Sequence, residues 1–316
     1  MKDLIDVVDL RGLLQSAGVD AASDDFEAVY SSLRSLPGRE PVVHQVEERV
    51  FAYFDQLRVP VRPTLYDHLV LSLRPKDVIA TFNWDPLLYQ ALRRCQGLAD
   101  PPLLLHLHGC TAIGYCDHGR RITWGDRAGR CSRCGGAFRP APILYPVAQK
   151  DYARDPMIRK AWSLVRRVLK QAYLVTVFGY SAPKTDFEAR RLLSSGWGRP
   201  AKRELEEFEF VDIRPGDDLA EEWRDFICET HYRSSRDFYQ STAGEYPRRG
   251  CEAVLAQVMD LQFPDPCPLP RRLGWKRLEG CLEPLLAAEA QARRARNLEE
   301  RQRRASAVGA KPIARD

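Results

Sequence analysis

The sequence predicts an α/β protein built on a Rossmann-like, doubly wound parallel sheet with one small insert. Three observations carry this prediction. Short apolar runs of strand length alternate with amphipathic helical stretches, polar residues gather where those runs end, and residues 110–140 lose apolar periodicity and become rich in Gly, Arg and Cys. Continuous apolar runs between helices are typical of strands that are covered on both faces, as in parallel sheets.

The helices and strands follow one another in a regular order. We expect helices at 1–14, 44–57, 64–73, 86–95, 157–172, from about 186, and at 219–227. We expect strands at 77–81, 103–107, 173–178 and 207–213. Residues 1–284 then form one domain with the insert at 110–140. Residues 285–316 are rich in Ala, Arg, Glu and Gln, which predicts a solvated helix that frays into a basic, disordered tail.

Composition narrows the class of protein. The chain has 316 residues, 44% of them hydrophobic, which is enough for a sizeable core. Its net charge of +5 is modest and comes largely from the C-terminal arginines, so it does not predict nucleic-acid binding. No signal peptide or membrane-spanning run is evident, so we expect a reducing, cytoplasmic location without membrane contact. Nine cysteines in that setting are candidates for metal ligands and not for a disulfide framework.

Polar residues follow three of the expected strands. They are Thr81, Asn83 and Asp85; His106, His108 and Gly109; and Gly179, Ser181 and Asp186. A single polar residue after a strand is usually a cap or turn former, and Asp85 before Pro86 suits the start of a helix. The carboxyl ends of parallel strands share one edge, where ligands bind. The three groups together therefore predict a binding site at that edge.

The insert contains a zinc-binding pattern. Cys131 and Cys134 are separated by two residues and followed by two glycines, as in a zinc knuckle. Cys116 is the third expected ligand, and the fourth is His118 or Cys110. Four protein ligands would close the coordination shell, which predicts a structural zinc on which the insert depends to fold. The alternative is a set of free cysteines in a surface loop.

These motifs occur in a recognisable order. The segments TFNWD, HLHG, the cysteine module, RPAPILYP and VFGYSAPKTD, within roughly 62–215, resemble the sirtuin family. The match is closest to bacterial sirtuin-like NAD-hydrolase domains of the defence type. The resemblance implies that Asn83 and His108 are the catalytic pair and that NAD is the substrate.

The resemblance also implies a set of residues that bind NAD. They are Thr81, Asp85, Gly109, Gly179, Ser181, Asp186 and Asp212. Asp85 matches the acidic residue of the family's nicotinamide pocket, and Gly179 and Ser181 match the turn that contacts phosphate and ribose. Asp212 falls where the family contacts the adenosine ribose.

The residue types suit this chemistry independently. Cleaving the nicotinamide–ribose bond passes through an oxocarbenium-like centre, and the amide of Asn83 can hold ribose hydroxyls or a water without titrating. The imidazole of His108 can take a proton from a hydroxyl or from water. His106 is a rival, but Gly109 after His108 would permit close approach of a ligand. We expect Asn83 and His108 to face a cleft.

Two departures from the family pattern matter. The family's Gly-Ala-Gly-x-Ser turn, which holds the pyrophosphate at a helix N-terminus, has no counterpart here. Either the reading frame begins earlier, or this form lacks the first strand and half of the cofactor site. Protein deacylases carry a Phe-Gly-Glu segment after the zinc module, where this chain reads ILYPVAQKDY. That difference favours an NAD hydrolase, such as an antiviral defence effector, over an NAD-dependent protein deacylase.

Two other classes of function remain open. The chain could be a catalytically silent sirtuin-like module that binds a nucleotide or a protein, which the missing Gly-rich turn favours. It could also be a zinc-ribbon nucleic-acid binder that uses the Arg-rich residues 120–133, although aromatic residues for base stacking are nearly absent there. A homo-oligomer or a regulatory protein partner is compatible with each of these readings.

Overall fold

The structure, a computed structural model, describes residues 3–20, 24–118, 121–125, 129–146, 152, 154–180, 186–228 and 231–309. The helices are α1 (Leu4–Val7), α2 (Arg11–Ser16), α3 (Phe26–Ser35), α4 (Glu40–Asp55), α5 (Leu65–Ser72), α6 (Leu87–Cys95), α7 (Pro156–Leu169), α8 (Phe187–Trp197), α9 (Gly216–Glu222), α10 (Thr242–Glu245), α11 (Gly250–Met259) and α12 (Trp275–Gly309), with 3-10 turns η1 (Pro200–Lys202) and η2 (Phe238–Gln240). The strands are β1 (Val78–Thr81), β2 (Leu103–His106), β3 (Ile113–Cys116), β4 (Arg121–Trp124), β5 (Arg139–Pro140), β6 (Leu174–Phe178), β7 (Glu207–Val211) and β8 (Tyr232–Ser235).

The core of the protein contains two parallel sheets. One pairs β1 with β2, and the other has the order β6-β7-β8. The α/β class and the parallel pairing are therefore confirmed, and each expected strand lies within two residues of an observed one. In the part of the chain that the structure describes, no strand joins β1 to β6, so the expected single sheet is divided into two.

The carboxyl ends of the two sheets lie side by side. Phe82, just after β1, stacks on Tyr180, just after β6, with ring centroids 4.1 Å apart. Below them α7 and α8 pack on β2 through a buried cluster that includes Leu107, Ile158 and Trp162. The side chains of β7 are all buried, whereas β1 and β6 are only partly covered. This edge therefore brings the strand-end residues of both sheets into one region.

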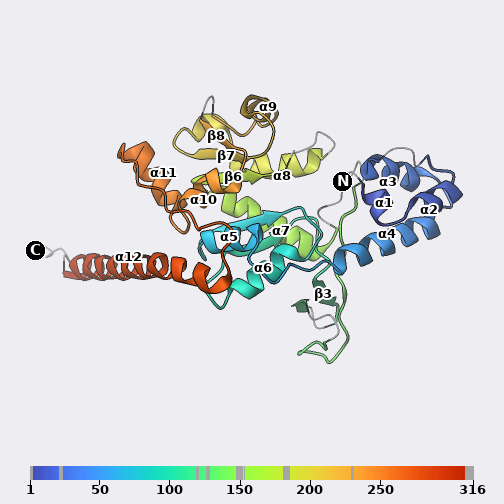
Figure 1. Cartoon of the computed structure of the whole chain (residues 1–316), viewed down its shortest axis with the longest axis horizontal. Helices are drawn as coiled ribbons and strands as arrows, with labels where there is room; N and C mark the ends of the chain where they lie inside the picture. The colour runs from blue at the N-terminus through green and yellow to red at the C-terminus, as the bar shows by residue number, and fades with distance from the viewer. Residues whose placement is uncertain are drawn as a thin grey trace, which may run out of the picture.

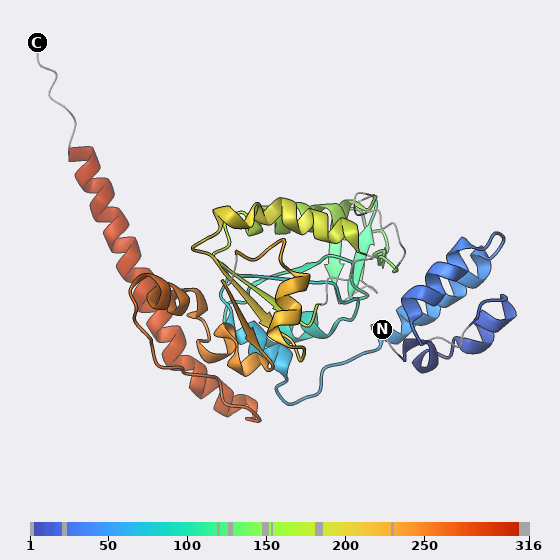
Figure 2. The ribbon, with the colours of Figure 1, turned by 90° about the horizontal axis from the view of Figure 1, so that it is seen from above.

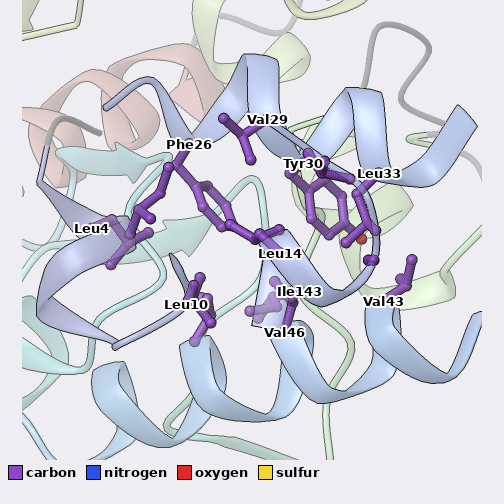
Figure 3. Close-up of a cluster of buried hydrophobic side chains, with 14 of the residues drawn as sticks. Leu4, Leu10, Leu14, Phe26, Val29, Tyr30, Leu33, Val43, Val46 and Ile143 are labelled. Atoms are coloured by element: carbon purple, nitrogen blue, oxygen red, sulfur yellow. The ribbon is translucent and has the colours of Figure 1, made fainter. Parts of the chain in front are cut away.

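The N-terminal helices form a bundle with a core of their own (Figures 1 and 2). Figure 3 shows leucine, valine and aromatic side chains of α1 to α4 gathered around Phe26 and Tyr30. Ile143, which follows the insert, lies among them and links the bundle to the rest of the protein. The expected single opening helix is divided into α1 and α2, because Asp9 adopts a left-handed backbone with φ 53°.

The insert forms a small three-stranded sheet of order β4-β3-β5 that was not expected from the sequence. Its strands are only two to four residues long and lie below the body in Figure 1. The apolar cluster next to it is small, built on Cys110, Ala112, Ile113 and Ala141. Packing alone gives this insert little to fold around.

The C-terminal segment is one long helix. α12 has 35 residues, contains Pro284 and extends away from the body (Figures 1 and 2). Its Ala, Arg, Glu and Leu content favours the helical state, so the described part of the tail stays helical to Gly309 where we expected fraying. No helix in the described ranges is long and apolar enough to cross a membrane.

Candidate functional site

The register of β1 and β2 places the two expected catalytic residues at matching positions. Thr81 pairs with His106, so Asn83 and His108 each follow their strand by the same two residues. Asn83 is exposed, whereas His108 retains 8% of its accessible surface. The parallel pairing therefore brings both residues to the carboxyl edge, as the sequence predicts.

Asn83 is held by its own neighbours. Its backbone N–H donates to the hydroxyl of Thr81 at 3.1 Å, and its side chain acts on the pKa of Tyr66 on α5. Its carbonyl oxygen lies 3.5 Å from Nδ1 of His106. The hydroxyl of Thr81 thus serves the turn after β1. Asn83 remains the exposed polar group of this corner.

Asp85 begins the helix behind the site. Its Oδ1 accepts a hydrogen bond from the N–H of Leu87 at 3.0 Å, as expected of a residue before Pro86 and α6. Burial raises the pKa of Asp85, and this hydrogen bond offsets only part of the effect. Asp85 thus caps α6 through one carboxyl oxygen. Its half-buried carboxyl can also form a hydrogen bond with an amide ligand.

His108 belongs to a buried hydrogen-bonded group. Its Nε2 lies 2.8 Å from the hydroxyl of Tyr152, which donates to Oδ1 of Asp186 at 2.8 Å. Oδ2 of Asp186 is 3.6 Å from the same ring nitrogen, and the ring of Phe82 packs edge-on at 4.8 Å. We expected His108 to face an open cleft, and this expectation is wrong because these side chains cover most of the imidazole.

Asp186 has other partners than the cofactor contact that we expected. It is 3% exposed, and its Oδ1 also accepts from the N–H of Ala189 at 3.4 Å at the start of α8. An acidic N-cap is favourable at this end of a helix. Asp186 therefore joins α8 to the His108 group.

His106 differs from His108 in its surroundings. It is 5% exposed, its ring centroid lies 5.6 Å from that of Trp124, and burial lowers its pKa to about 4. Its Nε2 is buried and has no hydrogen-bond partner among the described residues. A neutral, enclosed ring of this kind suits packing, and the choice of His108 over His106 stays a prediction.

Gly109 is needed for a close approach, although not the one expected. Its φ is +81°, and a Cβ there would lie 2.4 Å from the carbonyl oxygen of Pro142. The segment after the insert therefore returns directly over Gly109, and the N–H of Leu144 donates to the carbonyl of His108 at 2.8 Å. Gly109 makes room for the protein's own backbone, and its contact with a ligand stays a prediction.

The turn after β6 is only partly described. Gly179 has φ +63°, its N–H donates to the carbonyl of Val211 at 3.0 Å, and a Cβ there would meet nothing within 4 Å. Open space beside Gly179 is compatible with the phosphate contact implied for this turn. Ser181 lies outside the described residues.

Asp212 lines a separate depression at the ends of β7 and β8. The open cavity measures about 510 Å³ and is lined by Asp212, Arg214, Pro215, Gly216, Ser234, Ser235, Arg236 and Gln240. Arg214 hydrogen-bonds the carboxylate of Asp212 through its backbone N–H at 3.0 Å and its guanidinium at 3.0 Å, and holds the pKa of Asp212 low. The depression therefore combines an ionised carboxylate with cationic side chains.

Three cysteines of the insert converge. The sulfur atoms of Cys116, Cys131 and Cys134 lie within 4.8 Å of one another, and those of Cys116 and Cys134 are 3.3 Å apart. Tetrahedral zinc, with Zn–S bonds of about 2.3 Å, separates its sulfur ligands by about 3.8 Å. Hydrogen bonds from backbone N–H groups of residues 133 and 134 lower the pKa of Cys131 to about 7. These three side chains fit a zinc ion.

The surroundings of the sulfur atoms support the same fit. A Cβ on Gly136 would lie 3.3 Å from the sulfur of Cys134, so the glycine leaves room at the cluster. His118 is exposed and lies outside the three-sulfur group. Cys110 is turned away, because its thiol donates to the carbonyl of Asp85 at 3.4 Å. The structure thus assembles three of the four expected ligands.

Tyr152 is the site residue that the sequence did not reveal. It lies in a segment without a recognisable motif, and only the fold brings its hydroxyl to His108 and Asp186. A tyrosine shortly before a helix carries no signal of such a role. Phe82 was visible as part of TFNWD, but its contact with His108 was not.

Comparisons with known proteins give only distant likenesses. No family profile and no curated protein match the chain. Among solved structures, Sir2Tm bound to a propionylated peptide is 16% identical and covers 72% of this chain and 84% of its own, with a TM-score of 0.40. A Sir2 homologue in complex with NAD is 14% identical and covers 78% of this chain and 87% of its own, with a TM-score of 0.39. At these TM-scores and identities, the likenesses establish neither a family nor a function for this chain.

Proposed function

We propose that this protein is an NAD-consuming enzyme that cleaves the nicotinamide–ribose bond by hydrolysis. The observation that carries the proposal is the placement of Asn83 and His108 at matching positions after two paired parallel strands. The motif resemblance assigns the catalytic pair to these same two residues. The hydrogen-bonded group behind His108 gives the imidazole a fixed orientation.

The residues would divide the reaction between them. As the glycosidic bond breaks, nicotinamide leaves with the bonding electrons and positive charge develops on the ribose. The exposed amide of Asn83 holds a ribose hydroxyl or the attacking water, while His108 accepts the proton that this water loses. The products are nicotinamide, ADP-ribose and one proton, which His108 later releases to solvent.

The adenosine end of NAD would occupy the depression beside Asp212. The carboxylate keeps lone pairs for a ribose hydroxyl even while Arg214 occupies part of it. Arg214 and Arg236 supply positive charge for the pyrophosphate. Gly179, with open space beside it, would lie on the path between the two ends.

The segment after the insert favours a hydrolase over a protein deacylase. In the resembled family, deacylases use this region for acyl-lysine. Here Ile143 is buried in the N-terminal bundle, and the hydroxyl of Tyr145 donates to the carbonyl of Glu47 on α4 at 2.8 Å. The ring of Tyr145 also stacks on that of Tyr30 at 5.2 Å. The bundle covers the segment, which supports water and not a peptide as the acceptor.

Zinc would have a structural role in this enzyme. Cys116, Cys131 and Cys134 would hold it together with a fourth ligand, for which His118 remains our proposal. When bound, the ion would cross-link the insert and would not supply a reactive water, because the three thiolates belong to the insert and not to the carboxyl ends of β1 and β2.

Nicotinamide release from NAD tests the proposed reaction. The chain and its Asn83→Ala and His108→Ala variants are incubated with NAD, and nicotinamide and ADP-ribose are separated and quantified. We expect equal amounts of both products from the native chain and a loss of both in the variants. Nicotinamide release that requires an acyl-lysine peptide, with O-acyl-ADP-ribose formed in place of ADP-ribose, would instead identify a deacylase.

A silent nucleotide-binding module is the second candidate. The observation that favours it is the division between β1 and β6, which leaves the described part without a strand and Gly-rich turn to hold the pyrophosphate. In that case NAD or ADP-ribose binds, measured by calorimetry, but no nicotinamide is released. The same two measurements on a chain that carries an added Gly-rich strand serve as the comparison.

A further inference from the structure

The hydroxyl of Tyr152 lies between a histidine and a carboxylate. It is 2.8 Å from Nε2 of His108 and 2.8 Å from Oδ1 of Asp186, and that oxygen also accepts from the N–H of Ala189. An ionised carboxylate can only accept hydrogen bonds. The single hydroxyl proton of Tyr152 therefore points to Asp186, and a lone pair of the hydroxyl oxygen faces His108.

This order of donors determines where the imidazole carries its proton. Since the Tyr152 oxygen accepts, Nε2 of His108 has to donate and so carries a hydrogen. In the neutral ring Nδ1 is then the nitrogen that can accept a proton. When Nδ1 does so, the new positive charge lies close to Oδ2 of Asp186, which is 3.6 Å from the ring.

We propose that Tyr152 is a positioning residue that, with Asp186, keeps the proton of His108 on Nε2 and thereby makes Nδ1 the atom that accepts the proton in catalysis. The part of this proposal that concerns catalysis by Nδ1 rests on the proposed function. The part that concerns the proton on Nε2 and its hydrogen bond to Tyr152 does not. No proton leaves Tyr152 in this scheme. The water proton moves to Nδ1, hydroxide joins the ribose, and the bonding electrons leave with nicotinamide.

Packing holds Tyr152 in this position. Its ring lies 5.7 Å from that of His108 at 22°, and the ring of Trp162 packs edge-on at 4.8 Å. Trp162 is itself fixed, because its Nε1 donates to the carbonyl of Leu107 at 3.0 Å. Burial and the charge of Asp186 raise the pKa of Tyr152, so the hydroxyl keeps its proton.

Two described neighbours of the imidazole do not compete for this role. Phe82 covers one side of His108 with a ring that does not titrate. Tyr180 stacks on the far side of Phe82 and has a pKa raised by burial, so it is neutral. Among the groups whose contacts with His108 are described above, Asp186 is the charged one.

Nitrogen NMR of the full chain tests the hydrogen bonds without substrate. The six histidines are labelled with ¹⁵N, and the His108 signals are assigned by their loss in a His108→Asn variant. We expect a neutral ring protonated on Nε2, with a slowly exchanging proton. Tyr152→Phe keeps the ring contacts and removes the acceptor, so this proton should exchange about tenfold faster, the scale of one hydrogen bond.

Two variants serve as controls. Tyr145→Phe removes a buried hydroxyl from the bundle contact and should leave the His108 signals unchanged. Asp186→Asn keeps a good helix cap but removes the charge, so the pKa of His108 should fall. A ring protonated on Nδ1 in the native protein, or an unchanged Nε2 proton in a folded Tyr152→Phe variant, overturns the proposal. If Tyr152→Phe does not fold, an unchanged pKa in Asp186→Asn overturns it instead.

Kinetics separate the two proposals. In an active enzyme, Tyr152→Phe should lower kcat by about 10²-fold with little change in KM, the scale for a misplaced catalytic group. An unchanged kcat overturns the catalytic half of the positioning role. The expected NMR pattern in a chain that releases no nicotinamide supports the hydrogen bonding of Tyr152 and rejects NAD cleavage.

Discussion

The cysteine insert and the strand-end site are held together in different ways. The three sulfur atoms come from one short stretch of chain, and the apolar cluster beside them is small. His108, Tyr152 and Asp186 come from distant segments and lie against a group of aromatic rings that includes Phe82 and Trp162. We therefore expect the geometry of the insert to depend on a metal and that of the site to depend on packing.

Removing a thiolate should have the largest effect and break the insert alone. We expect Cys131→Ser to lose the bound zinc, because structural zinc contributes on the order of 10 kcal/mol to small metal-dependent folds. Metal analysis and limited proteolysis measure the result, with cleavage expected within 110–140. Cys267→Ser, at an exposed cysteine outside the sulfur group, is the matched control and should change neither. Zinc-free native protein with a protected insert would contradict the comparison.

Truncating the strand-end pair should affect catalysis more than folding. We expect Asn83→Ala and His108→Ala each to lower the rate of nicotinamide release by about 10²–10⁴-fold. The two should differ in stability. Asn83 is exposed and should change the free energy of unfolding by less than about 0.5 kcal/mol. His108→Ala should cost about 1–3 kcal/mol, because it leaves buried polar partners.

Urea unfolding beside the rate measurement tests this difference. Equal stability losses in the two variants would show that the site does not depend on the packing around His108. An unaffected rate in both variants would remove them from catalysis.

A buried ion pair behind the site should respond to acid. Asp67 on α5 is fully buried and paired with Arg94 on α6. Burial acts to raise the pKa of Asp67, but hydrogen bonds from Arg94 and Thr64 outweigh it and hold the pKa below its usual value. A lowered folded-state pKa gives stability that is present above about pH 4 and is lost as the pH falls through the folded value.

The Asp67→Asn substitution measures this contribution. We expect it to cost about 3–5 kcal/mol at neutral pH, since it leaves a guanidinium without its charge partner, and to flatten the acid limb of stability. The insert should keep its zinc, because Asp67 does not belong to the sulfur group. Zinc loss in this variant would show that the two regions are not independent.

His106 should give the smallest effect. Burial lowers its pKa to about 4, so between roughly pH 6.5 and pH 4 the unfolded chain binds a proton that the folded ring does not. The free energy of unfolding therefore decreases as the pH is lowered through this window. His106→Leu fills the place of the imidazole with an apolar side chain of similar size and should remove this pH dependence of stability. We expect it to change the rate of nicotinamide release by less than about threefold. A rate loss as large as that of His108→Ala would exchange the roles of the two histidines.

The strands were predictable because each is a short apolar run with a local signal. β1, β2, β6 and β7 all appear where the sequence places them. β8 was missed, because its sequence, Tyr232–Ser235, is polar and owes its strand form to pairing with β7. The division of the sheet was also invisible, since pairing between strands is set by the whole fold and not by any one segment.

The site was predictable only as far as motifs reach. Asn83 and His108 follow apolar runs, so their places after the strands could be read from the sequence. Cys131 and Cys134 were recognisable by their spacing. Tyr152 could not, because its role depends on the path of the chain from the insert into α7. The glycine signal at Gly109 was real, and the structure adds a cause that the sequence did not show, the close approach of the backbone at Pro142.

The division between the two parallel sheets also bears on solubility. In the described part of the chain, β1 and β6 each pair along one side only, and Phe178 at the end of β6 is 44% exposed. An unpaired side of a strand is a template for another extended chain. These edges flank the site, and we expect them to promote self-association as the protein concentration rises.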